Sequence, residues 1–258
     1  MIRKATRSTE DAIDSGRFTA RAYFPGHLLP GLTDHGLGPL ATIMESFLAP
    51  GTHIKLHEHV QDEIVSWVPA GVMRHDDPHG EHLVIDGDHL MVMNAGSGFQ
   101  HEERTREDDP PLRMLQIFVR PHSRDLEPGI QFGRLPASVP NEWRPVFGPQ
   151  GGDAPFHVRN AVSCYDLRLG AGEEAALPTR PDRHTYFFVF TGCVTADGET
   201  FGEAETGLVS DEATVTLRAT EASFVVAFVV DPDAAICREG SVGDGETVHR
   251  MAARARTA

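Results

Sequence analysis

Two short stretches of the chain carry the residues best suited to bind a metal ion. The first contains His57, His59 and Glu63, and the second contains His101 and Glu103. In an extended strand, residues two apart project to the same face, so the two residues of each pair should share a face. Glu63 is an even number of residues from His57 and His59, so we expect it on the same face as that pair. Neutral imidazoles with a carboxylate favour Fe(II), Mn(II), Ni(II), Cu(II) or Zn(II) over Mg(II) or Ca(II), which prefer oxygen ligands. We therefore predict one mononuclear transition-metal site.

The metal prediction depends on the joint spacing of these residues. Because the chain has 14 histidines in 258 residues, about one His-x-His pair is expected by chance. Much rarer is the combination of Gly51, a His-x-His-x3-Glu run from His57, a glycine at position 71, and a Gly-x-Gly-x-x-His run ending at His101. The combination, and not the histidine pair, indicates a metal site.

Composition excludes several functional classes. The formal net charge is −15, which disfavours direct binding to nucleic acid or to an anionic membrane. No apolar run approaches the roughly 18–20 residues that span a bilayer, and the first residues lack the apolar segment of a secretory signal. The three cysteines, Cys164, Cys193 and Cys237, are widely spaced and are expected to be reduced thiols. We expect a cytoplasmic protein.

Short apolar runs recur at intervals of about 8–12 residues between turn residues, a rhythm that predicts an antiparallel all-β sandwich or barrel. Phe18–Phe24, Leu40–Leu48 and Leu112–Val119 are such runs. No long helical periodicity is present. Residues 121–160 hold many prolines and few strand patterns, so we predict a linker there. For the tail, a terminal helix over Val248–Arg256 and an irregular end are both open.

The second half of the chain repeats the rhythm of the first. The run from Tyr186 to Gly198 matches the run from Val65 to Asp76, and placing Gly192 on Gly71 gives an offset of 121 residues. At this offset His57 falls on Pro178, His59 on Arg180 and Glu63 on His184. Since Thr214–Phe228 contains no histidine, we predict an internal duplication whose second copy keeps the fold and lacks the metal.

The motif spacing resembles that of the cupin superfamily. The His-x-His-x3-Glu run, the turn that starts at His75, the Ala95-Gly-Ser-Gly-x-x-His-x-Glu run and the strand Leu115–Val119 resemble the pirin branch. The resemblance implies an all-β bicupin made of two antiparallel β-barrel (double-stranded β-helix) domains. Residues 1–135 would form the N-terminal metal-binding cupin, and residues 136–258 a degenerate C-terminal cupin without metal.

The resemblance also implies a ligand set. His57, His59 and His101 are expected to bind the metal, most simply Fe(II), with Mn, Ni, Cu and Zn open. Pirin-like proteins use a glutamate at the position of Glu103 as fourth ligand, whereas the general cupin motif uses one at the position of Glu63. We favour Glu103 and expect Glu63 to accept a hydrogen bond from a ligand imidazole. Either carboxylate could take a substrate proton as general base.

Several neighbouring residues are expected to lie outside the site. The five other histidines closest to the motifs should be at the surface or rim, and they are His53, His75, His79, His82 and His89. Pirin-like sequences usually carry proline, arginine and glycine around the His-x-His run, whereas this chain has acidic residues at Glu58 and Asp62. We expect these two carboxylates to alter the rim.

The function implied by the resemblance is a mononuclear metal-dependent dioxygenase, with quercetinase-type (flavonol 2,3-dioxygenase) cleavage as the reaction. The substrates would be a small aromatic, enolic compound and O2. The alternative, also implied by the family, is a non-catalytic, redox-sensitive iron protein that acts by binding another protein. Because two cupins in one chain supply the pairing that single cupins obtain by dimerising, we expect a monomer.

Overall fold

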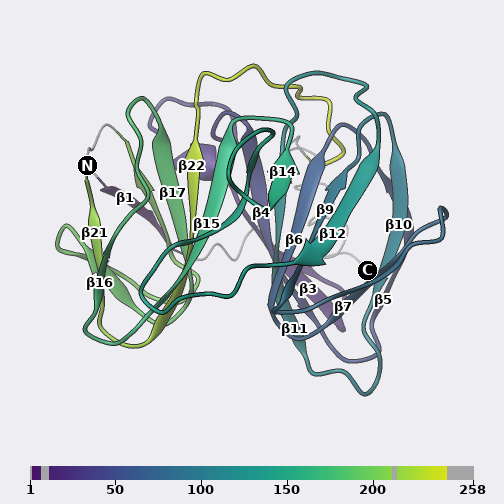
Figure 1. Cartoon of the computed structure of the whole chain (residues 1–258), viewed down its shortest axis with the longest axis horizontal. Coiled ribbons are helices and arrows are strands. Elements are labelled where there is room, and N and C mark those ends of the chain that lie inside the picture. The colour runs from purple at the N-terminus through teal and green to yellow at the C-terminus, as the bar shows by residue number, and fades with distance from the viewer. Residues whose placement is uncertain (1, 7–11, 211–213, 243–258) are drawn as a thin grey trace. The chain divides into compact units, whose positions relative to one another are not determined.

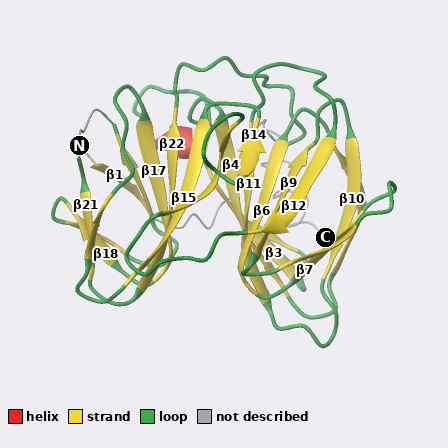
Figure 2. Ribbon diagram, viewed as in Figure 1, coloured by secondary structure: helices red, strands yellow, loops and turns green. Residues whose placement is uncertain are grey.

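In a computed structural model, the regular secondary structure of the described residues is almost entirely β-strand (Figure 1; Figure 2). The structure describes residues 2–6, 12–210 and 214–242. The helix in this part of the chain is a single 3₁₀ turn, η1 (Pro25–Leu28), and no helix among these residues is long and apolar enough to cross a membrane. The segment Val248–Arg256 lies outside the described residues.

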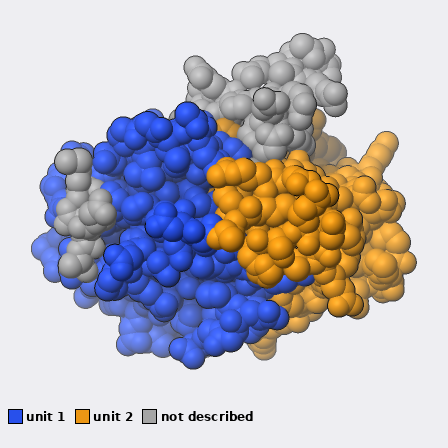
Figure 3. Space-filling view, turned by 90° about the horizontal axis from the view of Figure 1, so that it is seen from above, with its two compact units in different colours: residues 1–7, 25–39, 136–234 blue, residues 8–24, 40–135, 235–258 orange. Residues whose placement is uncertain are grey.

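The chain divides into two compact units, each composed of segments from different parts of the sequence (Figure 3). Unit 1 comprises Met1–Arg7, Pro25–Pro39 and Pro136–Ala234, and unit 2 comprises Ser8–Phe24, Leu40–Leu135 and Ala235–Ala258. The continuous domains expected from the sequence, 1–135 and 136–258, differ from these units at both chain ends and in the segment Pro25–Pro39.

Unit 2 contains both metal-ligand stretches and is formed by two sheets. The larger sheet has the strand order β12-β9-β6-β11-β4-β3-β2, and the smaller has the order β5-β10-β7-β8. The strands are β2 (Ala12–Asp14), β3 (Phe18–Tyr23), β4 (Leu40–Leu48), β5 (His53–His59), β6 (Glu63–Ala70), β7 (Met73–Asp76), β8 (His82–Ile85), β9 (His89–Asn94), β10 (Phe99–Arg104), β11 (Leu112–Val119) and β12 (Gly129–Arg134). All strand pairs in both sheets are antiparallel.

The core of unit 2 lies between its two sheets. Leu48, Val68 and Met114 of the larger sheet pack in one buried cluster with Met73 and Ile85 of the smaller sheet. Because side chains alternate across each strand, one face of each sheet supplies this core. Side chains on that face of β5 and β10 therefore point into the unit, and this orientation places the ligand stretches inside it.

Unit 1 has the same two-sheet construction. Its larger sheet has the order β1-β20-β17-β22-β15-β13-β14, and its smaller sheet has the order β16-β21-β18-β19. The strands are β1 (Ile2–Ala5), β13 (Arg144–Pro149), β14 (Phe156–Val158), β15 (Val162–Leu169), β16 (Glu174–Ala176), β17 (His184–Thr191), β18 (Val194–Ala196), β19 (Glu199–Phe201), β20 (Thr206–Val209), β21 (Thr216–Ala219) and β22 (Ser223–Val230). One strand pair, β13 with β14, is parallel.

The two units confirm the predicted duplication strand by strand. In both larger sheets the strand order corresponds, with β1 taking in unit 1 the place that β12 has in unit 2. The edge strands β14 and β2 differ, because β14 pairs in parallel with its neighbour and β2 pairs antiparallel. The central strands β6 and β17 begin 121 residues apart, at Glu63 and His184. The turns that follow them hold Gly71 and Gly192, both with positive φ. The N-terminal strand thus completes the second copy of the fold.

The predicted linker over residues 121–160 is wrong, because this stretch contains β12, β13 and β14. These strands lie at or next to the edges of the larger sheets. Proline is tolerated near a sheet edge because a missing N–H costs no central ladder bond there. Pro145 and Pro149 both lie within β13, so proline content concealed a strand.

Candidate metal centre

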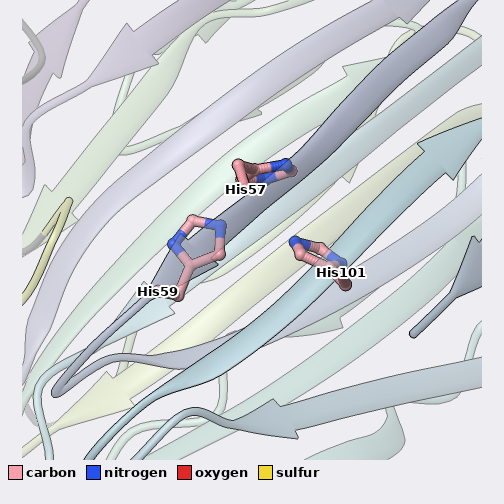
Figure 4. Close-up of side chains that lie close together, drawn as sticks. All are labelled: His57, His59 and His101. Atoms are coloured by element: carbon pink, nitrogen blue, oxygen red, sulfur yellow. The ribbon is translucent and has the colours of Figure 1, made fainter. Parts of the chain in front are cut away.

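Three histidines from β5 and β10 face one another inside unit 2 (Figure 4). The two strands are antiparallel neighbours, with His57 opposite His101 and His59 opposite Phe99. The ring centroids are 4.5 Å apart for His57 and His101, 4.9 Å for His57 and His59, and 5.2 Å for His59 and His101. One nitrogen from each ring lies within 4.8 Å of the other two. The sequence prediction that these histidines come together is therefore correct.

A bulge in β5 lies next to His57, on the side of Ile54. Residues His57 and Ile54 of β5 pair with His101 and Glu103 of β10, so three steps on one strand match two on the other. Such a bulge leaves an extra residue unpaired and locally disrupts the ladder. The His57 ring folds back so that its Nδ1 lies 2.9 Å from the carbonyl oxygen of Lys55.

The Nδ1 atom of every ring in the cluster is already engaged. His57 uses it on Lys55, His59 places it 3.2 Å from Ser241 Oγ, and His101 places it 3.1 Å from His75 Nδ1. This pattern leaves the three Nε2 atoms for another partner. His101 Nε2 is buried and has no hydrogen-bond partner in the described part of the chain. An unsatisfied buried nitrogen costs about 1–3 kcal/mol, and a metal ion bound there would remove that cost.

Burial keeps two of the rings in the neutral form that binds metals. His59 and His101 are 8% and 1% exposed. Desolvation, with a smaller contribution from His57, lowers the pKa of His59 to about 3. Desolvation, followed by the neighbouring histidines, lowers the pKa of His101 to about 2. Since His57 is only half-buried, the cluster is most accessible from its side. These donors fit a divalent transition ion.

Glu103 lies on the same inward face of β10 as His101, and its carboxylate accepts a hydrogen bond from Gln116. Gln116 Nε2 donates to Glu103 Oε1 over 2.7 Å. Burial raises the pKa of Glu103 to about 7, and the bond from Gln116 opposes this shift only in part. The carboxylate is not one of the group of mutually close ligand atoms, so its role as fourth ligand stays a prediction. A cation nearby would favour its charged form.

Glu63 lies on the other face of its sheet. Its cross-strand partners are Asn94 and Val119, and Asn94 Nδ2 donates to its Oε2. The neighbouring residue Ile64 pairs instead with Phe118, whose ring lies 6.1 Å from that of His59. The prediction that Glu63 shares a face with the histidines is therefore wrong. The turn between β5 and β6, where Gln61 has a φ of 54°, interrupts the two-residue alternation.

Sequence reasoning missed His75. This side chain is completely buried, and its two nitrogens contact His101 Nδ1 and Asp77 Oδ2. The expectation of a rim position is wrong because β7 turns Met73 and His75 to the same inward face. That shared parity with Met73 was the available signal. The other four histidines near the motifs are exposed or half-buried, as expected, and they are His53, His79, His82 and His89.

The sequence prediction misplaced Asp62 and did not include Ser241. Asp62 is buried, not at the rim, and its Oδ2 accepts hydrogen bonds from Ser241 Oγ at 2.7 Å and from the backbone N–H of Val242 at 3.0 Å. Ser241 in turn contacts His59. It lies 182 residues away from that histidine along the chain, and no motif surrounds it. Only the folded structure could reveal this contact.

Comparisons with known proteins agree with this fold. The pirin family profile matches residues 32–119, and that of the quercetinase C-terminal cupin domain matches residues 146–230. A quercetin 2,3-dioxygenase from Escherichia coli (strain K12) is 23% identical over 197 residues, which are 76% of this chain and 84% of the relative. The chain is a bicupin, a protein built from two cupin domains.

Solved structures share the same architecture. A bacterial pirin from Escherichia coli in complex with nickel(II) is 21% identical and superposes with a TM-score of 0.76 over 89% of this chain and 99% of that protein. A quercetin 2,3-dioxygenase from Acinetobacter baumannii is 17% identical, with a TM-score of 0.73 over 90% of this chain and 79% of that protein. At these identities the likeness concerns the fold. The two matched profiles identify the chain as pirin-like.

Proposed function

We propose that the protein is a mononuclear metal-dependent dioxygenase that cleaves a flavonol or a similar enolic aromatic compound with O2. The observation that carries the proposal is the His57, His59 and His101 cluster, in which the Nδ1 atoms are engaged and the buried Nε2 of His101 has no partner. The relatives named quercetin 2,3-dioxygenase support the reaction class.

The three histidines would hold one divalent transition ion, with Glu103 as fourth ligand. Fe(II) is the ion we propose first, although the same donors suit Mn, Ni, Cu and Zn. When bound, the ion would act as a Lewis acid toward the substrate oxygens and would provide an electron path to O2. A small chelating substrate would reach the centre beside His57, which is the least buried of the three rings.

Glu103 is suited to manage a proton. In metal-free protein burial raises its pKa to about 7, whereas beside a bound cation the carboxylate would be charged and able to accept a proton. The hydrogen bond from Gln116 uses Oε1, so Oε2 would be the atom that meets a ligand. We propose that Glu103 accepts the hydroxyl proton of the substrate, and Glu63, on the other face of its sheet, has no part in this step.

Apolar side chains border the histidines and suit an aromatic substrate. Phe99, Phe118, Met44 and Met93 belong to one buried cluster, and the Phe118 ring contacts His59. Aromatic rings pack well against such side chains and displace water. Exclusion of water would strengthen the electrostatic interactions at the centre.

Oxygen uptake tests this function. Protein stripped of metal and reloaded anaerobically with Fe(II) should consume O2 only after a flavonol is added, and the His101→Ala variant should show no such uptake. His53→Ala is the matched control, because His53 lies on β5 but is exposed and bonded to Glu102. No uptake by the wild type across a flavonol panel would overturn the proposal and favour the regulatory alternative.

A further inference from the structure

The strongest unexplained feature of unit 2 is a buried chain of three side chains that ends on a ligand histidine. Asp77 Oδ2 lies 3.2 Å from His75 Nε2, and His75 Nδ1 lies 3.1 Å from His101 Nδ1. The side chains of Asp77 and His75 are both fully buried. The proposed reaction uses neither residue.

The direction of the hydrogen bonds follows from the chemistry of the end groups. A carboxylate can only accept, so Asp77 requires the proton of His75 to be on Nε2. A neutral imidazole carries one N–H, and therefore His75 Nδ1 accepts. The ring nitrogen facing it, His101 Nδ1, must then donate. This leaves His101 Nε2 unprotonated, with its lone pair available where the structure shows a buried nitrogen without a partner.

A second series of hydrogen bonds places the ring proton of His59 on Nδ1 as well. Ser241 Oγ donates to Asp62 Oδ2 and lies 3.2 Å from His59 Nδ1. Because the only hydroxyl hydrogen of Ser241 is used on Asp62, Ser241 accepts from His59 Nδ1. Both buried histidines of the cluster are thus linked to a carboxylate through one intermediate side chain, and both carry the ring proton on the nitrogen away from the centre.

We infer that Asp77 and His75 are positioning residues that hold His101 in the Nδ1–H tautomer, so that its Nε2 is preorganised to bind a metal ion. The inference deepens the proposed function and rests on its metal site. It does not depend on which substrate is used. Partners of this kind typically change metal affinity by about 10–100-fold when they are mutated.

Asp77→Asn is a sharp test, because the surrounding backbone fixes the orientation of the new amide. Asp77 Oδ1 accepts hydrogen bonds from the backbone N–H groups of His79 and Glu81 at 2.8 Å and 3.3 Å. The amide oxygen of the variant must keep that position, which places its NH2 group against His75 Nε2. The hydrogen bonds from residue 77 to His75 and from His75 to His101 then both reverse their direction. His101 therefore carries its proton on Nε2, where it blocks metal ligation.

The measurement is the ring tautomer in metal-free protein, read from long-range 1H–15N correlation spectra and assigned with a His101→Asn variant. We expect His101 as the Nδ1–H tautomer and His75 as the Nε2–H tautomer in the wild type. In Asp77→Asn we expect the Nε2–H tautomer at His101 and about 10–100-fold weaker binding of Ni2+ by calorimetry. Asp86→Asn is the matched control, because Asp86 bonds His89 away from the cluster, and it should change neither property.

An Nε2–H tautomer of His101 in the wild type would overturn the inference, whatever the Asp77→Asn variant shows. Unchanged tautomers and unchanged Ni2+ affinity in a folded Asp77→Asn protein would also overturn it. Neither readout uses a flavonol or O2. Failure of the proposed dioxygenase activity would therefore be distinguishable from failure of the positioning role.

Discussion

Gln116 and Glu103 are joined by a hydrogen bond of 2.7 Å that connects the two sheets of unit 2. The donor is a neutral amide, so it satisfies one carboxylate oxygen without neutralising the charge. Burial therefore dominates and raises the pKa of Glu103 to about 7 from 4.5. In metal-free protein the folded state therefore favours the protonated form of this carboxylate.

Glu103→Gln should change how the stability of metal-free protein depends on pH. Between pH 4.5 and about 7 the unfolded state releases the Glu103 proton while the folded state retains it, so wild-type stability falls as pH rises through this window. The loss is about 3 kcal/mol, at roughly 1.4 kcal/mol per pKa unit. The stability of the variant minus that of the wild type should rise by this amount from pH 4.5 to pH 8 in urea unfolding.

Glu102→Gln is the control for this experiment. Glu102 is the neighbouring residue on β10 and is partly exposed, and it is bonded to His53. Its substitution should leave the pH dependence close to that of the wild type. A difference between Glu103→Gln and wild type that stays constant across pH would contradict the raised pKa.

The buried histidines should make metal-free protein less stable as the pH falls, whereas Glu103 makes it less stable as the pH rises. His59 and His101 have folded pKa values of about 3 and about 2, below the usual 6.5, so below pH 6.5 the unfolded state binds protons that the folded state rejects. Their contribution to stability is complete above pH 6.5 and is lost as pH falls. His59→Gln in metal-free protein should flatten the slope between pH 6.5 and 5 by up to ~1.4 kcal/mol per pH unit. An unchanged slope would argue against a neutral, buried His59.

Metal content should depend on the three histidines individually. His57→Ala, His59→Ala and His101→Ala should each purify with far less than the one transition-metal ion per chain expected for the wild type, by elemental analysis. His53→Ala and His82→Ala should retain it, because both residues are exposed, His53 on β5 itself and His82 on β8. Retention of metal by His101→Ala would place the ion elsewhere.

The duplicated turns should be equally intolerant of a side chain. A Cβ at Gly71 would lie 2.5 Å from Leu112 Cα, and one at Gly192 would lie 2.7 Å from Ser223 Cα. Gly80 and Gly198 also have positive φ, but a Cβ there meets nothing within 4 Å. Alanine at the second pair should cost about 1–2 kcal/mol for the backbone conformation, and alanine at the first pair about 1–3 kcal/mol more for the clash. Equal losses at all four positions in urea unfolding would contradict the shared close contact.

The sequence predicts local geometry well where one strand carries the information. The His57 and His59 pair and the Gly71 and Gly192 register are both properties of short segments, and both appear in the structure. The parity count fails at Glu63 because a turn separates it from β5, and alternation holds only within a continuous strand. A count that stopped at His59 would have avoided the error.

The remaining parts of the site depend on contacts between distant segments. Ser241 reaches His59 across 182 residues, and Gln116 meets Glu103 from the opposite sheet. Neither contact follows from a spacing rule. Strand β1 comes from the N-terminus but belongs to the second copy of the fold. A prediction of two continuous domains could not include it there.

We propose above that His57, His59 and His101 surround one transition-metal ion in unit 2. Anomalous diffraction from crystals of protein loaded with Fe(II) or Ni(II), recorded at the absorption edge of the metal, locates that ion directly. We expect a single strong peak bound by the Nε2 atoms of the three histidines, with Glu103 as fourth ligand. A peak in unit 1, or none within bonding distance of these imidazoles, would contradict it.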